Sequence, residues 1–344
     1  MNKPELYACA LLMNDLHIGP DSLVDFQLNW DEALRICEER GIQQIIIGGD
    51  LFESRVGQRL SVLQTVYQAL CKAEAQDIEI TIAEGNHDKV DQEAIFGYCH
   101  VFGKFPNLFV VDDFLEMEFP DGPTMYIMSY FPENGSFSER LQQLTDHLDP
   151  QAFNILYCHT GINGALAKSS DKEVPAKIFS AFNKVVVGHY HDRCVIDGTN
   201  IEYIGASRQK NFGEDSAKGY TILYSDGSMK FIQNTINTRY CTIEATTVKE
   251  AKELLESHKD EKLKVKVRIT CPSDAASTVD KEALLELGAT KVEVVAENAD
   301  SVAKATDFDS KYDKAGLKDE YVRFCKQKEI KNIDLGLAYL DKIN

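Results

Sequence analysis

The chain has 344 residues, 44% of them hydrophobic, which is enough for one large domain and a smaller one, each with its own core. Its net charge of −18 excludes a surface that is basic throughout. No apolar run is long enough to span a bilayer, and nine cysteines without a CxxC pair are typical of reduced thiols. We therefore expect a cytoplasmic protein without cysteine-bound zinc.

The first 100 residues alternate between strand and helix patterns. Residues 6–14 form an apolar run that leads directly into polar residues, which favours a core strand over a signal peptide. Residues 26–40 carry apolar side chains at helical spacing, and Gly41 follows as a C-terminal cap. This alternation predicts parallel strands with helices on the sheet faces. Two further apolar runs lie at residues 42–48 and 78–83, and a stripe of apolar residues at helical spacing lies between them at residues 60–70.

Later apolar segments are shorter and are separated by turns. We expect residues 1–239 to form an α/β core of two β-sheets flanked by helices, in four layers (α/β-β/α). The later strands are predicted at 108–111, 125–129, 153–158, 184–187, 201–203 and 220–224.

The pattern changes from Tyr240 onward, where three strand patterns and two helical patterns predict a small α+β domain over residues 240–298. Residues 299–316 are polar and lack periodicity, which is typical of a linker. Residues 317–344 predict C-terminal helices. Because an amphipathic helix after a linker has little core of its own to join, we expect this segment to bind a partner.

Five motifs rich in metal-binding residues each follow an apolar run, where a strand of an open α/β sheet would end. They contain five of the eight histidines; His100, His147 and His258 stand outside and are interpreted as packed or surface residues. One such motif is weak evidence, whereas five in a fixed order are strong. The motifs are Asp15-Leu16-His17, Gly49-Asp50-Leu51-Phe52-Glu53, Gly85-Asn86-His87-Asp88, Cys158-His159-Thr160-Gly161 and Gly188-His189-Tyr190-His191.

These residue types suit the hydrolysis of a phosphodiester by two metal ions. Two cations about 3.5–4 Å apart can acidify a water and neutralise phosphoryl oxygens. Because side chains alternate along an extended chain, we expect Asp15 and His17 to point to one side, and His189 and His191 to do the same. Nitrogen and oxygen ligands without sulfur suit manganese, and also iron, zinc or magnesium.

The second, third and fourth motifs complete this predicted set. Asp50 is the natural bridge between the two ions, with Asn86 and His159 as further ligands. His87 stands beside Asn86 but need not bind metal, which leaves it free to act on the phosphate or the leaving group.

The motifs resemble those of the calcineurin-like metallophosphoesterase superfamily over residues 1–240, and most of all the nuclease subunits of the SbcD and meiotic-recombination-eleven type. Gly49-Asp50-Leu51-Phe52 has the nuclease form of the second motif, whereas protein phosphatases usually carry Asp-Arg-Gly there and Glu in place of Asp88. Residues 203–207 and 212–214 resemble the family's aromatic-x-Gly-Ser segment and its following Glu. The short chain is consistent with a compact phage-encoded version.

The resemblance also implies roles for individual residues. His87 becomes the transition-state or leaving-group residue, and Asp88 its support. Some relatives carry a His where Glu53 stands, so an additional role at that position is in doubt. The implied ligands are Asp15, His17, Asp50 and His191 for one metal, and Asp50, Asn86, His159 and His189 for the other.

For the rest of the chain, the resemblance implies that residues 240–298 cap the DNA site. It also implies that the C-terminal helices dock an SMC-like (SbcC-type) ATPase, and that part of residues 60–105 is a candidate homodimer face. The expected function is a manganese-dependent DNA exonuclease and endonuclease subunit in DNA repair, recombination or replication, in a bacterial or phage-infected cell.

Charge is the main observation against DNA, because residues 241–344 hold 18 basic and 21 acidic residues, so −15 of the net charge falls on residues 1–240. One alternative is a phosphodiesterase of nucleotides or other small phosphoesters. Another is a non-catalytic scaffold that recruits an ATPase. Four basic residues near the last motifs are interpreted as solvated charges rather than phosphate contacts: Arg193, Arg208, Lys210 and Lys218.

Overall fold

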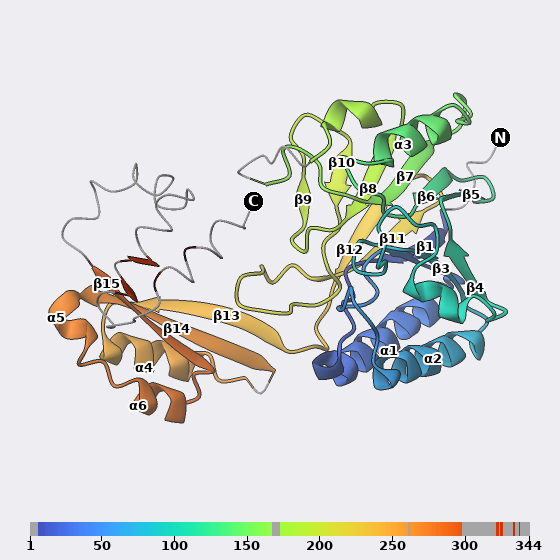
Figure 1. Cartoon of the computed structure of the whole chain (residues 1–344). Coiled ribbons are helices and arrows are strands. Elements are labelled where there is room, and N and C mark those ends of the chain that lie inside the picture. The colour runs from blue at the N-terminus through green and yellow to red at the C-terminus, as the bar shows by residue number, and fades with distance from the viewer. Residues whose placement is uncertain are drawn as a thin grey trace. The chain divides into compact units, whose positions relative to one another are not determined.

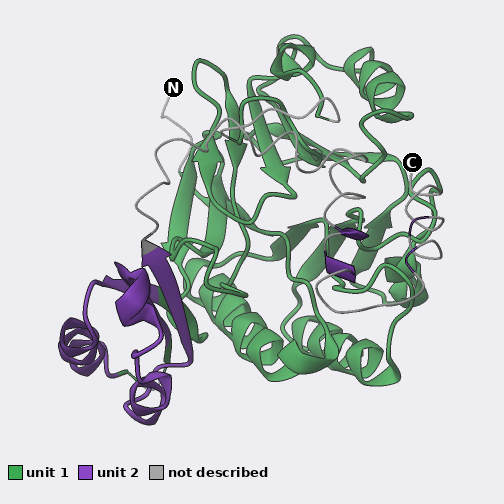
Figure 2. Ribbon diagram, turned by 60° about the vertical axis from the view of Figure 1, so that its left-hand side comes forward, with its two compact units in different colours: residues 1–241, 260–264 green, residues 242–259, 265–344 purple. Residues whose placement is uncertain are grey.

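The chain divides into two compact units, residues 1–241 with 260–264 and residues 242–259 with 265–344, coloured separately in Figure 2. None of the helices in the described part is both long and apolar enough to cross a bilayer. The computed structural model describes residues 6–166, 173–260 and 262–297, together with Tyr321, Val322, Phe324, Cys325, Ile333 and Leu337.

Unit 1 contains two six-stranded sheets, and most of their strands are labelled in Figure 1. The first sheet consists of β1 (Ala8–Met13), β2 (Gln44–Gly48), β3 (Glu79–Ala83), β4 (Leu108–Val111), β11 (Gly219–Tyr224) and β12 (Met229–Gln233). Their order is β12-β11-β1-β2-β3-β4. The strands from β1 to β4 pair in parallel, as predicted, whereas β11 and β12 join them antiparallel.

Two helices, α1 (Leu23–Arg40) and α2 (Leu60–Glu74), pack with the first sheet in one hydrophobic cluster. Trp30 of α1 donates its indole N–H to the Ala69 carbonyl of α2 at 2.8 Å, which fixes the two helices to each other. α1 ends at Gly41, whose φ of 65° is the left-handed conformation that glycine adopts without strain. The predicted cap is confirmed.

The second sheet consists of β5 (Phe114–Glu118), β6 (Thr124–Met128), β7 (Asn154–His159), β8 (Lys184–Gly188), β9 (Cys194–Val195) and β10 (Ile201–Tyr203). Their order is β5-β6-β7-β8-β10-β9. The four inner strands pair in parallel, and the two edge strands are antiparallel to them. The helix α3 (Phe137–Thr145) and the 3₁₀ helix η3 (Ala176–Phe179) pack with this sheet.

A third cluster fills the space between the two sheets and explains why the strand sequences are apolar without interruption. In β1, Ala10 and Leu12 belong to this inner cluster, whereas Leu11 and Met13 face the helices. Strands of both sheets are therefore covered on both faces, as the runs of apolar residues predicted. The predicted fold class, two mixed sheets flanked by helices, is confirmed.

Most of unit 2 is built on a three-stranded sheet. Its strands are β13 (Arg239–Ala245), β14 (Leu263–Pro272) and β15 (Lys291–Glu297), in the order β13-β14-β15. Its helices are α4 (Val248–Ser257), α5 (Ser273–Ala276) and α6 (Lys281–Glu286). Thr247 and Asp280 cap α4 and α6 by accepting backbone amide protons from Glu250 and Ala283.

Some elements escaped the sequence analysis. The strands β5, β9 and β12 lie at sheet edges, where a strand is short or has an exposed face and so lacks a long apolar run. The helices α3 and α5 were also missed; they have nine and four residues. The predicted boundary at 239/240 falls inside β13. The predicted linker 299–316 and most of the helical segment 317–344 lie outside the described residues.

Candidate metal centre

The seven predicted ligands come from the carboxyl ends of five strands in both sheets. Asp15 and His17 follow β1, Asp50 follows β2 and Asn86 follows β3. In the second sheet, His159 is the last residue of β7, and His189 and His191 follow β8. Because these strands are parallel within each sheet, their carboxyl ends meet at one edge.

The chain reaches this edge in a conformation that the sequence analysis did not foresee. Asp15 and His17 have φ values of 53° and 44°, so they do not lie on an extended strand, and the predicted alternation there is wrong. Asp50 and His189 are also left-handed, with φ values of 53° and 96°. A non-glycine residue in such a conformation costs about 1–3 kcal/mol, so strain is concentrated at the site.

Backbone hydrogen bonds fix the two loops that carry this strain. The amides of Asp15 and His17 donate to the carbonyls of Gly49 and Asp50 at 3.0 and 2.9 Å. Gly49 has a φ of 108°, and a Cβ there would collide with the His159 ring. These hydrogen bonds hold the first two motifs in contact, and the His159 ring packs directly against Gly49.

One group of donors surrounds the Nε2 atom of His17. This atom lies 3.8 Å from Asp15 Oδ1, 3.5 Å from Asp50 Oδ2 and 2.9 Å from Nε2 of His191. The four side chains are those that the family resemblance assigns to one metal.

The other group surrounds the amide oxygen of Asn86. Its Oδ1 lies 3.2 Å from both His159 Nε2 and His189 Nδ1. His159 Nε2 is also 3.4 Å from Asp50 Oδ2, the same oxygen that faces His17. Asp50 therefore stands between the two groups, while its other oxygen accepts the His87 amide proton at 2.8 Å.

Burial and charge act in opposite directions on these side chains. Burial lowers the pKa of His17 to about 2 and that of His189 to about 4, so both rings are neutral and can bind a cation. Burial opposes the charge of His159 as well, but the carboxylate of Asp50 outweighs it and raises the pKa of His159 to about 9. A cation bound beside Asp50 would replace that proton.

The donor set fits a pair of divalent cations. It contains imidazole nitrogen and carboxylate or amide oxygen, and three triads each have donor atoms within 4.8 Å of one another. Ligands of one cation, with bonds of about 2.0–2.2 Å, stand about 3–4 Å apart. The donor pairs described above lie 2.9–3.8 Å apart. The triads are Asp15, His17 and His191; His17, Asp50 and His87; and Asp15, Asp50 and His159.

A family model described as calcineurin-like phosphoesterase matches residues 10–193, more than half of the chain. The chain belongs to this family. Its members are metal-dependent phosphoesterases that bind two divalent cations. The matched range contains all seven candidate ligands.

Two solved structures are similar to this chain at low sequence identity. A nuclease, MPE, from Pseudomonas putida is 15% identical, with a TM-score of 0.30 over 62% of this chain and 82% of that one. A dimetal phosphatase from Danio rerio is 12% identical, with a TM-score of 0.45 over 67% of this chain and 97% of that one. The family assignment rests on the match to residues 10–193.

The two predicted catalytic residues occupy different environments. His87 is half-buried; its ring lies 4.7 Å from that of His17, and its Nδ1 atom is 2.7 Å from the Glu53 carbonyl oxygen. Asp88 is fully buried and accepts the amide protons of Leu51, Phe52 and Gly85 at 2.8–3.1 Å. Its carboxylate thus joins the second and third motifs. None of these three hydrogen bonds is to His87, and the support of His87 by Asp88 stays a prediction.

The four basic residues near the last motifs are not the solvated charges that we expected. Lys210 pairs with the carboxylate of Glu53. Arg208 is buried and donates to the carbonyls of Leu16 and His17 at 2.9 and 3.3 Å. Lys218 is buried too, and donates to the His191 carbonyl at 2.8 Å. The guanidinium of Arg193 pairs with a carboxylate, that of Glu202, at 2.8 Å. Arg208 and Lys218 hold the main chain beside two candidate ligands, and a buried cation needs such acceptors.

Two residues that support the site went unnoticed in the sequence. The hydroxyl of Tyr157, on the inner face of β7, donates its proton to two acceptors at 2.8 Å, the Met13 carbonyl oxygen and Asn14 Oδ1. Asn14 in turn donates to the Gly205 carbonyl at 2.9 Å. In the sequence, Tyr157 resembled any other aromatic residue of a core. Its position in β7 directs its side chain to the face between the two sheets. The proximity of Asn14 to Asp15 was the one available sign.

The three histidines outside the motifs stay away from the donor groups. His100 pairs with Glu84 and Asp112, and His147 and His258 lie near backbone carbonyls of their own helical turns. These contacts agree with packed and surface roles.

Proposed function

We propose that this protein is a manganese-dependent phosphodiesterase that cleaves DNA as an exonuclease and endonuclease of the SbcD and meiotic-recombination-eleven type. The observation that carries the two-metal chemistry is the Asp50 carboxylate, which lies 3.5 Å from His17 and 3.4 Å from His159 and so joins two donor groups. A bound cation pair would acidify a water and neutralise the phosphoryl oxygens. Nitrogen and oxygen donors without sulfur suit manganese, as they also suit iron, zinc or magnesium, and the family resemblance is the reason to propose manganese.

His87 is the proposed acid for the departing sugar oxygen. When its ring is protonated, Nδ1–H donates to the Glu53 carbonyl oxygen at 2.7 Å, so Nε2–H is the proton available to the leaving group. The ring is half-buried, which leaves it accessible to a substrate.

DNA as the substrate is supported by the nuclease form of the second motif and by space beside the site. A cavity of about 470 Å³ adjoins Asn86 and His189 and is lined also by Arg55, Tyr130 and Tyr190. A cationic and two aromatic side chains suit a phosphate and a nucleobase.

Small phosphoesters are the second candidate substrate. Glu133 and Glu173 line the same cavity, and residues 1–240 carry most of the net charge of −18, which opposes a long polyanion. The scaffold alternative is disfavoured because all seven candidate donors are present and converge.

The partners belong to the same proposal. We propose that residues 317–344 bind an SMC-like ATPase, and that residues 240–298 help to shape the DNA site. A homodimer face within residues 60–105 is supported by exposed apolar side chains there, since Leu60, Phe96 and Val101 are 79%, 69% and 62% exposed.

The test is cleavage by the purified chain with Mn²⁺, using linear and single-stranded DNA against bis-p-nitrophenyl phosphate, with Asp50→Ala as control. DNA cleavage that the variant lacks is the expected result. Turnover of the small ester alone, with and without an added SMC-like ATPase, would move the small-phosphoester function ahead. Equal DNA cleavage by Asp50→Ala would identify a contaminating nuclease and contradict the proposal.

A further inference from the structure

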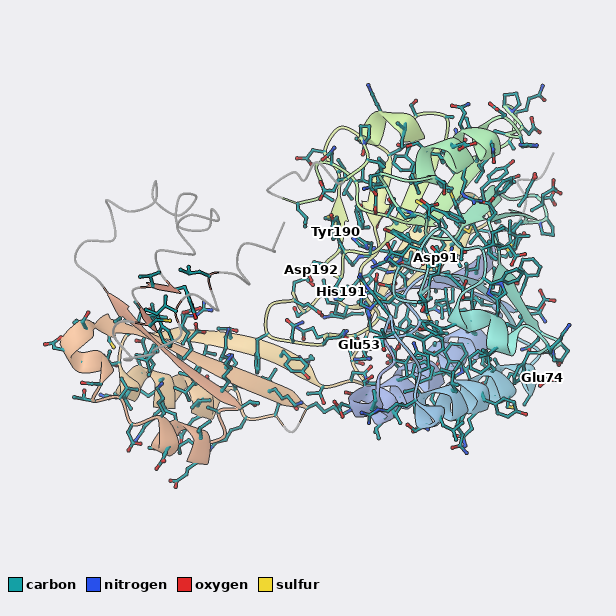
Figure 3. All side chains as sticks on the ribbon, in the orientation of Figure 1. Glu53, Glu74, Asp91, Tyr190, His191 and Asp192 are labelled. Carbon is teal, nitrogen blue, oxygen red and sulfur yellow. The ribbon has the colours of Figure 1, made fainter. Side chains whose placement is uncertain are left out.

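Glu53 occupies a fixed place at the metal centre although the family pattern assigns it no role. Its backbone is held on two sides: its amide donates to the Ile18 carbonyl at 3.2 Å, and its carbonyl lies 2.7 Å from the His87 ring. Its side-chain stem passes Gly19 so closely that a Cβ on that glycine would lie 3.3 Å from the Glu53 Cβ. The backbone of Glu53, and with it the point from which its side chain starts, is therefore fixed. Figure 3 labels Glu53 and His191 on the same side of unit 1.

The carboxylate of Glu53 faces the back of the His17 ring. His17 Nε2 faces Asp50 and His191, whereas His17 Nδ1 is 3.5 Å from Glu53 Oε2. This Nδ1 atom is buried, and it forms no hydrogen bond with any of the described residues. A buried ring nitrogen that lacks a partner is costly, and the nearest acidic oxygen belongs to Glu53.

His191 shows how a ring in this position is held. Its Nδ1 lies 2.9 Å from Glu214 Oε1, a distance typical of a hydrogen bond to a carboxylate. The same glutamate accepts the Lys210 amide proton through Oε2 at 3.0 Å. The ammonium group of Lys210 in turn pairs with Glu53. Lys210 thus links the carboxylate behind His191 to the carboxylate behind His17.

We propose that Glu53 is a positioning residue that orients His17 through Nδ1, as Glu214 does for His191. The inference rests on the proposed metal centre. A ligand histidine usually donates its other N–H to a carboxylate or carbonyl, which fixes its tautomer and ring orientation. Glu53 supplies that acceptor from the second motif, while Glu214 supplies it from the segment after the fifth.

A competing explanation is that Glu53 merely neutralises Lys210. The two explanations differ in one variant. If Glu53 acts on His17, its loss weakens cation binding whether or not Lys210 is present. If it acts only as a counterion, removing Lys210 together with Glu53 restores binding, because the unpaired ammonium group that repels the cation is gone.

The experiment is a Mn²⁺ titration without substrate, with free Mn²⁺ followed by electron paramagnetic resonance. We expect Glu53→Ala to weaken one of two binding steps by about 10–100-fold, the range for loss of a group that supports a ligand. Glu53→Gln should retain most of the affinity, because its amide oxygen still accepts the Nδ1 proton. Lys210→Met should leave the affinity unchanged or increase it, and the double variant Glu53→Ala/Lys210→Met should stay as weak as Glu53→Ala.

Glu39→Ala is the matched control, because Glu39 is also about half-exposed and pairs with a cation, Arg35, on α1. It should bind Mn²⁺ like the wild type. Recovery of wild-type affinity in the double variant, or unchanged affinity in Glu53→Ala, would overturn the inference. The readout needs no substrate. If the Mn²⁺ affinity depends on Glu53 as expected but the wild type cleaves no DNA, only the proposed substrate would be refuted. Thermal unfolding without metal reports whether each variant is folded.

Discussion

The two sheets of unit 1 each have four parallel strands, and they contribute different chemistry to the same centre. The first sheet supplies every oxygen donor, from Asp15, Asp50 and Asn86, together with one ring, His17. The second supplies only imidazoles, from His159, His189 and His191. Each donor group takes members from both sheets, so neither sheet alone contains a complete site. The packing of the sheets therefore assembles the centre.

The largest effect is expected at the one residue that both groups share. Asp50→Ala removes the carboxylate that faces His17 and His159, so we expect loss of cation binding in both groups and loss of phosphodiesterase activity. Mn²⁺ stoichiometry and hydrolysis of bis-p-nitrophenyl phosphate measure the two losses. A variant that still binds two Mn²⁺ ions would show that Asp50 does not bridge the groups.

His87→Ala should leave both cations bound and slow the cleavage of DNA by about 10²–10⁴-fold, the contribution of a well-placed acid. The loss should be much smaller on bis-p-nitrophenyl phosphate, because nitrophenolate departs without protonation. Equal losses on the two substrates would refute the role of His87 as the acid, and loss of Mn²⁺ would make it a ligand.

A third set of variants tests whether the donors that bind one cation come from the same sheet or from the same donor group. Asp15 and His191 come from different sheets but lie with His17 in one group, so Asp15→Ala and His191→Ala should weaken the same Mn²⁺ binding step. His189→Ala should weaken the other step. Titrations of the single variants and of the Asp15→Ala/His191→Ala double variant measure this. If His189→Ala and His191→Ala affected one common step instead, the grouping would be wrong.

The smallest effect is expected at the contact between the sheets. Tyr157→Phe keeps the ring but removes the hydroxyl that bonds to the Met13 carbonyl and Asn14 Oδ1, so we expect a loss of about 1–3 kcal/mol in the free energy of unfolding. Denaturant unfolding measures it. Tyr98→Phe is a suitable control, because the Tyr98 hydroxyl bonds to the Arg55 carbonyl at an exposed position. Equal losses of unfolding free energy in the two variants would show that the buried hydroxyl of Tyr157 stabilises the fold no more than an exposed one.

Much of the fold could be read from the sequence because its patterns are local. Uninterrupted apolar runs such as residues 42–48 predicted strands covered on both faces, and the helical stripe of residues 60–70 predicted α2. The edge strands β5, β9 and β12 could not be predicted in this way, since one exposed face or a length of two residues leaves no pattern.

The candidate site was predictable in composition but not in geometry. The motifs name residues with metal-binding side chains, and their positions after strands place them at one sheet edge. The left-handed turns at Asp15, His17 and His189 depend on hydrogen bonds between loops far apart in the chain, so local sequence does not reveal them. The roles of Arg208 and Lys218 were hidden for the same reason, because their acceptors belong to other loops.

The sequence by itself determined the fold class, the family and the chemical types of the donors, because each is encoded in short, ordered patterns. Only the tertiary structure decided which donors face one another and that Glu53 lies beside Nδ1 of His17. It also decided that basic side chains such as Arg208, and the hydroxyl of Tyr157, hold the loops of the site. These contacts join residues that are distant in sequence. They arise only when the two sheets pack and bring their carboxyl edges together.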